Sequence, residues 1–213
     1  MATKIVDYDL ADGPRDLNNL APYSHVLVLF RWRGKPLGRV RIGVENGGLS
    51  QHTLWWTAST NFGYAALPNI MEEIVSDDDN RIDEISKLPT CSVVISTHNR
   101  VDDLQRCLDS IFAFTASDIE IIVVDNAPSD DSTARLSANY PVRYIIERRK
   151  GASWARTRGA KEASGEVVVY VDDDVVVDNN WVDNLLQPFV RPEVAAVTSL
   201  VMPLELETGA QEL

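Results

Sequence analysis

The chain has few of the residues that build disulfide frameworks or zinc sites. Its 213 residues include only two cysteines, Cys91 and Cys107, too few and too far apart for a disulfide scaffold or a Cys-x-x-Cys site. The three histidines, His25, His52 and His98, are scattered and form no zinc-binding pattern. We therefore expect neither a zinc protein nor a disulfide-stabilised domain.

Long hydrophobic runs are also missing. No apolar run approaches the roughly 18 residues that span a bilayer, and four aspartates in the first 16 residues are unlike a secretory signal. Hydrophobic residues make up 45% of the chain and charged residues 24%, which excludes wholesale disorder, a collagen-like repeat and a membrane channel. These features predict a globular protein of the reduced, cytoplasmic compartment with no membrane span.

Positive charge is scarce but concentrated. The net charge of −12 argues against a partner held by bulk attraction, such as nucleic acid or an anionic membrane. Seven of the 20 basic residues nevertheless fall between Arg143 and Lys161, where Glu147 is the only acid. A cationic segment inside an acidic chain indicates a small anionic ligand.

The first part of the chain predicts a small α+β domain over residues 1–75, of unknown role. Apolar and polar residues alternate on both sides of a Gly-Lys-Pro turn over residues 25–44, which predicts a β-hairpin. Residues 49–75 predict one or two helices with a break near 61–63. Residues 76–89 predict an acidic linker, and we interpret its Asp77-Asp78-Asp79 run as a solvated turn.

The second part, residues 90–213, alternates strands with helices. The predicted strands are 93–95, 119–124, 142–146, 167–171 and 194–197, and the predicted helices are 101–112, 131–138, 154–163 and 181–187. Strands that are apolar on both faces predict an α/β fold, with a mostly parallel sheet covered by helices on both faces. In such sheets, ligands bind beyond the carboxyl ends of the strands.

Three aspartates, Asp172, Asp173 and Asp174, directly follow the fourth strand. If the chain stays extended, Asp172 and Asp174 point the same way and Asp173 points the other way. Two carboxylates this close repel each other unless a cation lies between them, and Mg²⁺ or Mn²⁺ suits oxygen ligands. We favour a cation site here over a solvated acidic turn.

The cationic segment gives a second argument. Ser153 is a candidate N-cap for the helix that follows, which would place Arg156 at the third helical position, where a capping box has an acid. Gly165 suits the C-terminal cap of the same helix. A cation near a helix N-terminus is disfavoured, because the N-terminus carries partial positive charge. A bound phosphate would make the arrangement favourable, because the helix N-terminus and the arginines both attract an anion. The alternative, that these side chains extend into water or pair with distant aspartates, stays open for each single arginine.

A cation site and a phosphate-binding helix start on one sheet edge together describe a nucleotide diphosphate site. Asp125, which follows the second strand, suits a base N–H donor such as N3–H of uracil. An Asx-turn or a helix cap is nearly as good an interpretation of Asp125.

These residues resemble the family 2 glycosyltransferases, which have the Rossmann-like GT-A fold for nucleotide-diphospho-sugars. Cys91 through Arg100 is similar to the family's first strand and loop, Ile122 through Asn126 to its second, and Gly151 through Gly159 to its conserved helix start, with Thr157 where the family has Asn. Asp172-Asp173-Asp174 resembles its DxD motif. The resemblance covers about residues 90–200, in order.

The resemblance implies transfer of a sugar from a nucleotide diphosphate, in the first instance UDP, to an acceptor hydroxyl with inversion. Asp125 and the Thr97 backbone would hold the base, and Arg156 and Arg158 would approach the diphosphate. The nucleotide-binding residues implied are Thr97, Asn99, Arg100, Asp125, Arg156, Arg158, Asp172 and Asp173, and the ligands implied for Mn²⁺ or Mg²⁺ are Asp172 and Asp174.

The family places its catalytic base well downstream of DxD, and no residue here matches it. Glu205, Glu207 and Glu212 are the carboxylates late in the chain, and none lies in a recognisable motif. The sequence therefore resembles a donor-binding half that lacks its acceptor-binding half. A catalytically silent nucleotide-sugar-binding module is the second interpretation. A nucleotidyltransferase ranks third, because the loop after the first strand lacks the glycines of that class.

Overall fold

The computed structural model describes residues 2–75, 88–115, 119–206, 208 and 211. The chain divides into two compact units, one of residues 1–84 with 199–213 and one of residues 85–198. Most of the predicted linker, including Asp77-Asp78-Asp79, lies outside the described residues. The predicted second domain ran to residue 213, whereas the last segment belongs to the first unit, where the Thr3 amide donates to the Leu206 carbonyl at 2.9 Å.

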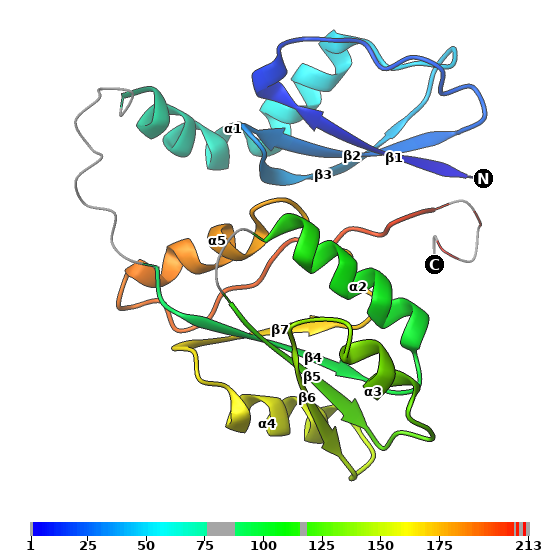
Figure 1. The fold of residues 1–213 in the computed structure, drawn as a ribbon. Coiled ribbons are helices and arrows are strands. Elements are labelled where there is room, and N and C mark those ends of the chain that lie inside the picture. Colours follow the sequence, from blue (N-terminus) through cyan, green and yellow to red (C-terminus); the bar gives the residue numbers. More distant parts are fainter. Residues whose placement is uncertain (1, 76–87, 116–118, 207, 209–210, 212–213) are drawn as a thin grey trace. The chain divides into compact units, whose positions relative to one another are not determined.

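The first unit contains a three-stranded sheet in the order β1-β2-β3 (Figure 1). Strand β1 (Thr3–Asp9) is parallel to β2 (His25–Trp32), which forms the predicted hairpin with the antiparallel β3 (Lys35–Gly43). A short 3-10 helix, η1 (Leu10–Asp12), follows β1. Strand β1 was not predicted, because charged residues interrupt its apolar positions.

Helix α1 (Gln51–Val75) packs on this sheet. The predicted break near residues 61–63 is wrong, because α1 is continuous. The Asn61 side chain donates to the Thr57 carbonyl at 2.9 Å, a bond to the preceding turn that leaves the helix intact. Leu54 and Ala58 of α1 are buried together with Val26, Val28, Phe30 and Tyr8 of the sheet.

The second unit has the predicted α/β architecture, with four parallel strands in the order β6-β5-β4-β7 (Figure 1). The strands are β4 (Cys91–Thr97), β5 (Glu120–Asn126), β6 (Arg143–Glu147) and β7 (Val167–Asp172). The helices are α2 (Val101–Phe114), α3 (Ser132–Ser137), α4 (Ala152–Glu162) and α5 (Trp181–Leu186), followed by the 3-10 helix η2 (Gln187–Val190). The strand predicted at 194–197 is wrong, since these residues have no regular structure.

Apolar layers form on both faces of this sheet. On one face, α2 and α5 bury Leu104, Leu108 and Leu186 against side chains that include Val93 and Val123. On the other face, Ala155 of α4 packs with the alternate strand residues Val94, Ile122 and Val124. Because successive strand residues point to opposite faces, both sets must be apolar, which explains the unbroken hydrophobic runs.

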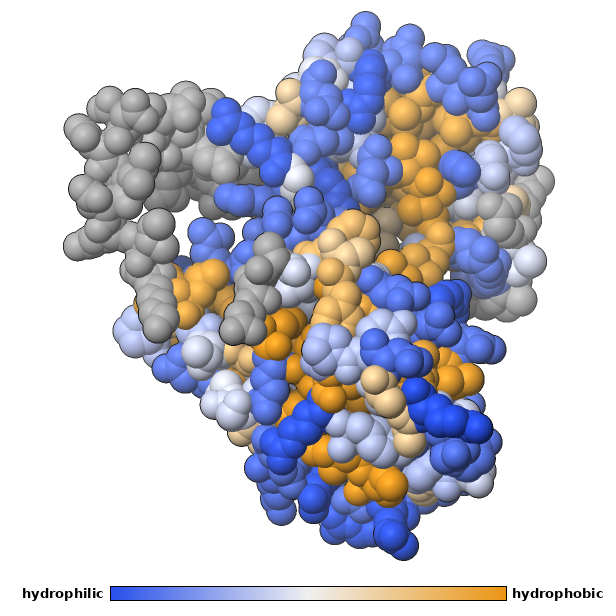
Figure 2. Space-filling model, in the orientation of Figure 1, coloured by the Kyte–Doolittle hydropathy of each residue, from blue (hydrophilic) through white to orange (hydrophobic). Residues whose placement is uncertain are grey.

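Hydrophilic residues cover much of the surface in Figure 2, with hydrophobic patches between them. Among the helices that the structure describes, none combines the length and the apolar character needed to cross a membrane. Both cysteines are free and buried. Burial raises the pKa of the Cys107 thiol to about 12, with a smaller contribution from the nearby Asp173 carboxylate.

Close packing of α4 on the sheet makes Gly159 sensitive to substitution. A Cβ atom at this position would overlap the Val94 side chain and lie 3.2 Å from Cγ2 of Val124. We expect Gly159→Ala to lower the free energy of unfolding. Overpacking destabilises by roughly 1–3 kcal/mol, whereas the higher helix propensity of alanine stabilises by up to about 1 kcal/mol. Urea denaturation measures the difference.

Gly63 in α1 is the matched control. A Cβ atom there would meet no heavy atom within 4 Å, so Gly63→Ala keeps the gain in helix preference without the overlap and is expected to stabilise the protein. A Gly159→Ala variant as stable as the Gly63→Ala variant would contradict the close packing of α4.

Candidate functional site

A cavity of about 370 Å³ opens at the carboxyl ends of the strands in the second unit. Three cationic and three acidic side chains line it, so its formal charges balance. The lining residues are Ser96, Thr97, His98, Arg100, Asn126, Lys150, Gly151, Ala152, Arg156, Asp172, Asp173 and Asp174. The strand-end rule therefore predicted the place of the cavity correctly.

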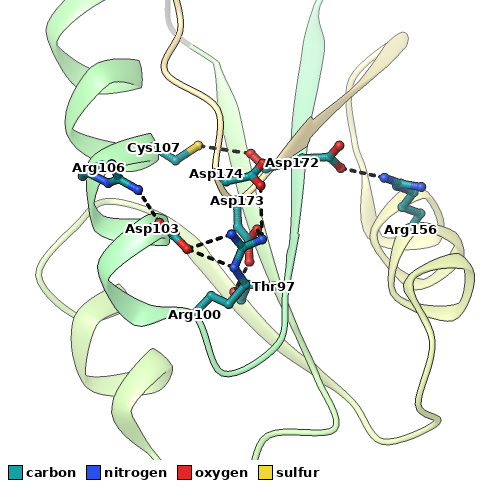
Figure 3. Close-up of polar contacts among 9 residues, drawn as sticks. All are labelled: Thr97, Arg100, Asp103, Arg106, Cys107, Arg156, Asp172, Asp173 and Asp174. Atoms are coloured by element: carbon teal, nitrogen blue, oxygen red, sulfur yellow. Dashed lines mark hydrogen bonds and ion pairs between the residues drawn. The ribbon is translucent and has the colours of Figure 1, made fainter. Parts of the chain in front are cut away.

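The three aspartates enter the cavity from the end of β7, where Asp172 is paired with Ser96 of β4. Asp172 bonds to Nη2 of Arg156 at 2.6 Å, whereas Asp173 and Asp174 both bond to Nη1 of Arg100, at 3.1 and 3.2 Å (Figure 3). The chain does not stay extended here, because β7 ends at Asp172 and the chain then turns, so the condition set for the alternation is not met.

Asp173 is the interior member of the three. Its residue is only 6% exposed, and its Oδ2 accepts a hydrogen bond from Oγ1 of Thr97 at 2.7 Å. Burial raises the pKa of Asp173, while the Thr97 hydroxyl and the Arg100 guanidinium oppose that rise. From α2, Sγ of Cys107 lies 3.7 Å from the Asp172 carbonyl (Figure 3).

Most arginines of the cationic segment pair with glutamates. Arg143 and Arg158 both bond to Glu162, and Arg149 forms a two-point contact with Glu147. These partners are not the distant aspartates of the alternative interpretation, because Arg149 and Arg158 pair with glutamates two and four residues away and only Arg143 reaches across 19 residues. Lys150 lines the cavity and makes no ion pair with a described carboxylate, so it and Arg156 remain as the segment's cations there.

The start of α4 differs from the prediction. The N-cap is Gly151 and the helix begins at Ala152, so Ser153 is not the cap and Arg156 lies in the second turn. Gly151 has a φ of 133°, a conformation that favours glycine. The helix ends at Glu162 with Ala163 as its C-cap, and not with Gly165.

Asn126 connects the loops that form the cavity wall. Its Nδ2 donates to the carbonyls of Glu147 and Arg149 at 3.3 and 2.8 Å, and its Oδ1 accepts from the Gly151 amide at 2.8 Å. Its own carbonyl accepts from Nδ1 of His98 at 2.6 Å, which leaves the other ring nitrogen of His98 without its proton when the ring is neutral. One buried side chain therefore sets the approach of the α4 N-terminus.

Three predicted nucleotide-binding residues, Asn99, Arg158 and Asp125, do not line the cavity. Oδ1 of Asn99 accepts bonds from the amide and hydroxyl of Ser129, and Arg158 pairs with Glu162 at the far end of its helix. Both of these side chains have local partners that compete with a ligand.

Asp125 is fully buried and does not itself line the cavity. Its Oδ2 accepts a hydrogen bond from the Tyr144 hydroxyl at 2.8 Å, whereas its Oδ1 has no partner in hydrogen-bonding geometry. Burial raises the pKa of Asp125, and the hydroxyls of Tyr144 and Thr133 oppose that rise. The unpaired oxygen is the exceptional feature, because buried polar atoms are almost always bonded.

The donor set at the end of β7 fits a hard divalent cation. Asp172 and Asp174 offer carboxylates that are 59% and 50% exposed. Mg²⁺ commonly takes one or two protein carboxylates and completes its coordination with phosphate oxygens and water. Across the described residues, no three His, Cys, Asp or Glu side chains form a cluster that could hold a metal ion.

Sequence reasoning missed several residues of the cavity. Asn126 follows Asp125 at the strand end, and its position alone could have identified it. Lys150 and His98 also occupy strand-end loops. Of the late carboxylates, Glu205 accepts a bond from Gln211 at 2.8 Å, and Glu207 and Glu212 lie outside the described residues.

Comparisons with known proteins match part of the chain. The family model described as glycosyl transferase family 2 matches residues 92–209. An uncharacterised glycosyltransferase of Escherichia coli K12, YibD, is 39% identical over 87 residues, which are 39% of this chain and 25% of that protein. Glycosyltransferase AglE of Haloferax volcanii is 29% identical over 106 residues, which are 46% of this chain and 34% of that protein.

Solved structures give a similar partial match. The mannosyltransferase PcManGT from Pyrobaculum calidifontis, in complex with GDP-Man and Mn²⁺, has a TM-score of 0.47 and 24% identity, and the match covers 51% of this chain and 34% of that one. The chain therefore spans only part of the relatives named above, 25% of the length of YibD and 34% of the length of AglE.

The Asn126 network predicts a loss of stability when this side chain is removed. Asn126→Ala leaves the Arg149 carbonyl and the Gly151 amide without their partner, so we expect the free energy of unfolding to fall by roughly 1–3 kcal/mol. Urea denaturation measures it, with Asn139→Ala as control, since Asn139 is exposed and makes a single bond, to the Arg135 carbonyl. Equal stability of the two variants would contradict a supporting role for Asn126.

The contacts of Glu147 predict a dependence of stability on pH. Hydrogen bonds from the Arg149 side chain and amide lower the pKa of Glu147 from 4.5 to about 2. Because the pKa is lowered on folding, its contribution is complete above the ordinary value and is lost as the pH falls toward 2. The stability advantage over Glu147→Gln should therefore shrink between about pH 5 and pH 2. Urea midpoints across that window measure it, and a constant difference would contradict this account.

Proposed function

Because the chain belongs to glycosyl transferase family 2, whose model matches more than half of it, we propose that the cavity binds a nucleotide-diphospho-sugar and transfers its sugar to an acceptor hydroxyl with inversion. The observation that carries this proposal is the meeting of the three aspartates, Lys150, Arg156 and the start of α4 at one cavity. The family resemblance that the sequence motifs indicated is confirmed.

The diphosphate would lie against the cationic side of the cavity. Lys150 makes no ion pair with a described carboxylate, and the first amides of α4 point out of the helix without intrahelical partners. Helix N-termini and basic side chains both favour phosphate oxygens. Arg156 reaches the same cavity from the second turn of α4, where Asp172 holds its guanidinium in place.

A divalent cation, Mn²⁺ or Mg²⁺, would be held by Asp174 and Asp172. When bound, it would supply positive charge that neutralises the diphosphate as that group leaves the sugar. The cavity already has balanced charges, so a cation and an anionic diphosphate entering together disturb the balance less than either alone.

Recognition of uracil at Asp125 is the finer part of the proposal. An N3–H donor would give the buried Oδ1 atom the partner that it lacks. Asp125 pairs with Thr97 across the sheet, and Thr97 and His98 both line the cavity, which supports a place for Asp125 next to it. Base binding therefore requires that Asp125 become accessible.

The acceptor and the catalytic base are not assigned. Each carboxylate that lines the cavity is bonded to an arginine, and Asp173 also to Thr97. This observation favours the second candidate, a module that binds nucleotide-sugar without turning it over. The two candidates share the cavity and differ only in chemistry.

Nucleotide binding is tested by thermal unfolding. We expect UDP with Mn²⁺ to raise the melting temperature, because a ligand that binds only the folded state stabilises it. Asp174→Asn should abolish the shift, since an amide is a far weaker cation ligand than a carboxylate. GDP with Mn²⁺, run beside UDP, measures the preference for uracil.

Asp131→Asn is the matched control, because Asp131 is an exposed aspartate that pairs with Arg135 away from the cavity, and it should keep the shift. The absence of a shift with every nucleotide diphosphate would reject both candidates. Binding of UDP-sugars without transfer or hydrolysis would select the silent module.

A further inference from the structure

Arg100 holds two of the three cavity aspartates with one guanidinium. Its Nη1 lies 3.1 Å from Oδ1 of Asp173 and 3.2 Å from Oδ2 of Asp174 (Figure 3). Asp173 is buried and its other oxygen is bonded to Thr97, whereas half of the Asp174 side chain is exposed. The contact with Asp174 is therefore the one that a ligand can reach.

The guanidinium is fixed from behind by α2. Nε and Nη2 of Arg100 both lie 2.9 Å from Oδ2 of Asp103, and the remaining oxygen of Asp103 bonds to Arg106. Arg100 itself is the N-cap residue of α2, so its backbone is fixed as well. A planar guanidinium held at three carboxylates is a positioned group and not a side chain free in solvent.

This arrangement gives Arg100 a different role from the nucleotide contact that the family resemblance implied. Its donors are directed at carboxylates, which leaves few of them for phosphate. Its positive charge lies beside Asp174, the carboxylate to which the proposed function assigns the cation. Arg100 and a divalent cation therefore compete at Asp174, where the guanidinium already bonds to Oδ2.

We propose that Arg100 is a built-in counter-ion that makes cation binding depend on the nucleotide. This inference rests on the proposed function for the identity of the nucleotide, but the competition at Asp174 does not. Without nucleotide, a cation at Oδ2 of Asp174 displaces the charge-assisted bond from Arg100, and a cation at the other oxygen is repelled by the adjacent guanidinium. With a diphosphate in the cavity, the released guanidinium gains an anionic partner, so the two ligands strengthen each other's binding.

The test is Mn²⁺ binding to the full chain, followed by the electron paramagnetic resonance signal of free Mn²⁺, with and without UDP. We expect Arg100→Gln to bind Mn²⁺ alone roughly three- to tenfold more tightly than the wild type, the range set by the loss of one partly exposed charge-assisted contact. The gain in Mn²⁺ affinity on adding UDP should be smaller in this variant. Arg106→Gln, which removes a cation whose ion-pair partner in the described part of the chain is Asp103, should behave as the wild type.

Melting temperatures show whether each variant is folded. If Arg100→Gln is unfolded, Arg100→Lys decides the matter, because an ammonium keeps the charge but cannot fork between carboxylates, and Mn²⁺ binding alone should still tighten. Unchanged or weaker Mn²⁺ binding by a folded Arg100 variant overturns the proposal. Absence of UDP binding by the wild type instead overturns the proposed function. The competition between Arg100 and Mn²⁺ is then still tested by the titration with Mn²⁺ alone.

Discussion

The pairing of aspartates with arginines at the carboxyl ends of the parallel strands is the interaction on which the site depends. Three carboxylates in sequence at the end of β7 would repel one another strongly in a partly buried cavity. Arg100 on one side and Arg156 on the other compensate this repulsion, and each bonds to a different part of the triplet. The same groups are those that a cation and a diphosphate would engage.

The sheet places these charges. Thr97 of β4 pairs with Asp125 of β5, and Ser96 pairs with Asp172 of β7, so the strand ends lie side by side. Asn126 then ties the loop after β6 to the start of α4. The cavity thus consists of loops that buried hydrogen bonds hold on a rigid apolar layer. This rigidity suits a binding site whose groups are already positioned before the ligand arrives.

Much of the second unit follows from its sequence, because its strands are apolar on both faces and only a parallel sheet covered by helices buries both. The cavity's place follows from the rule for strand ends. The choice of partners does not follow, since Arg156 bonds to Asp172 and Asn99 to Ser129 across long stretches of chain. Strand β1 also escaped prediction, because its pairing with β2 outweighs the charged residues within it.

The central claim is that the balanced charges around this cavity receive a nucleotide diphosphate together with a cation. The most direct measurement is a titration of ¹⁵N-labelled protein with UDP and Mg²⁺, followed by nuclear magnetic resonance. The account predicts the largest shift changes at the amides of Gly151 and Ala152 and at the side-chain Nε of Arg156. Shift changes confined to residues of the first unit, or none at saturating ligand, would contradict it.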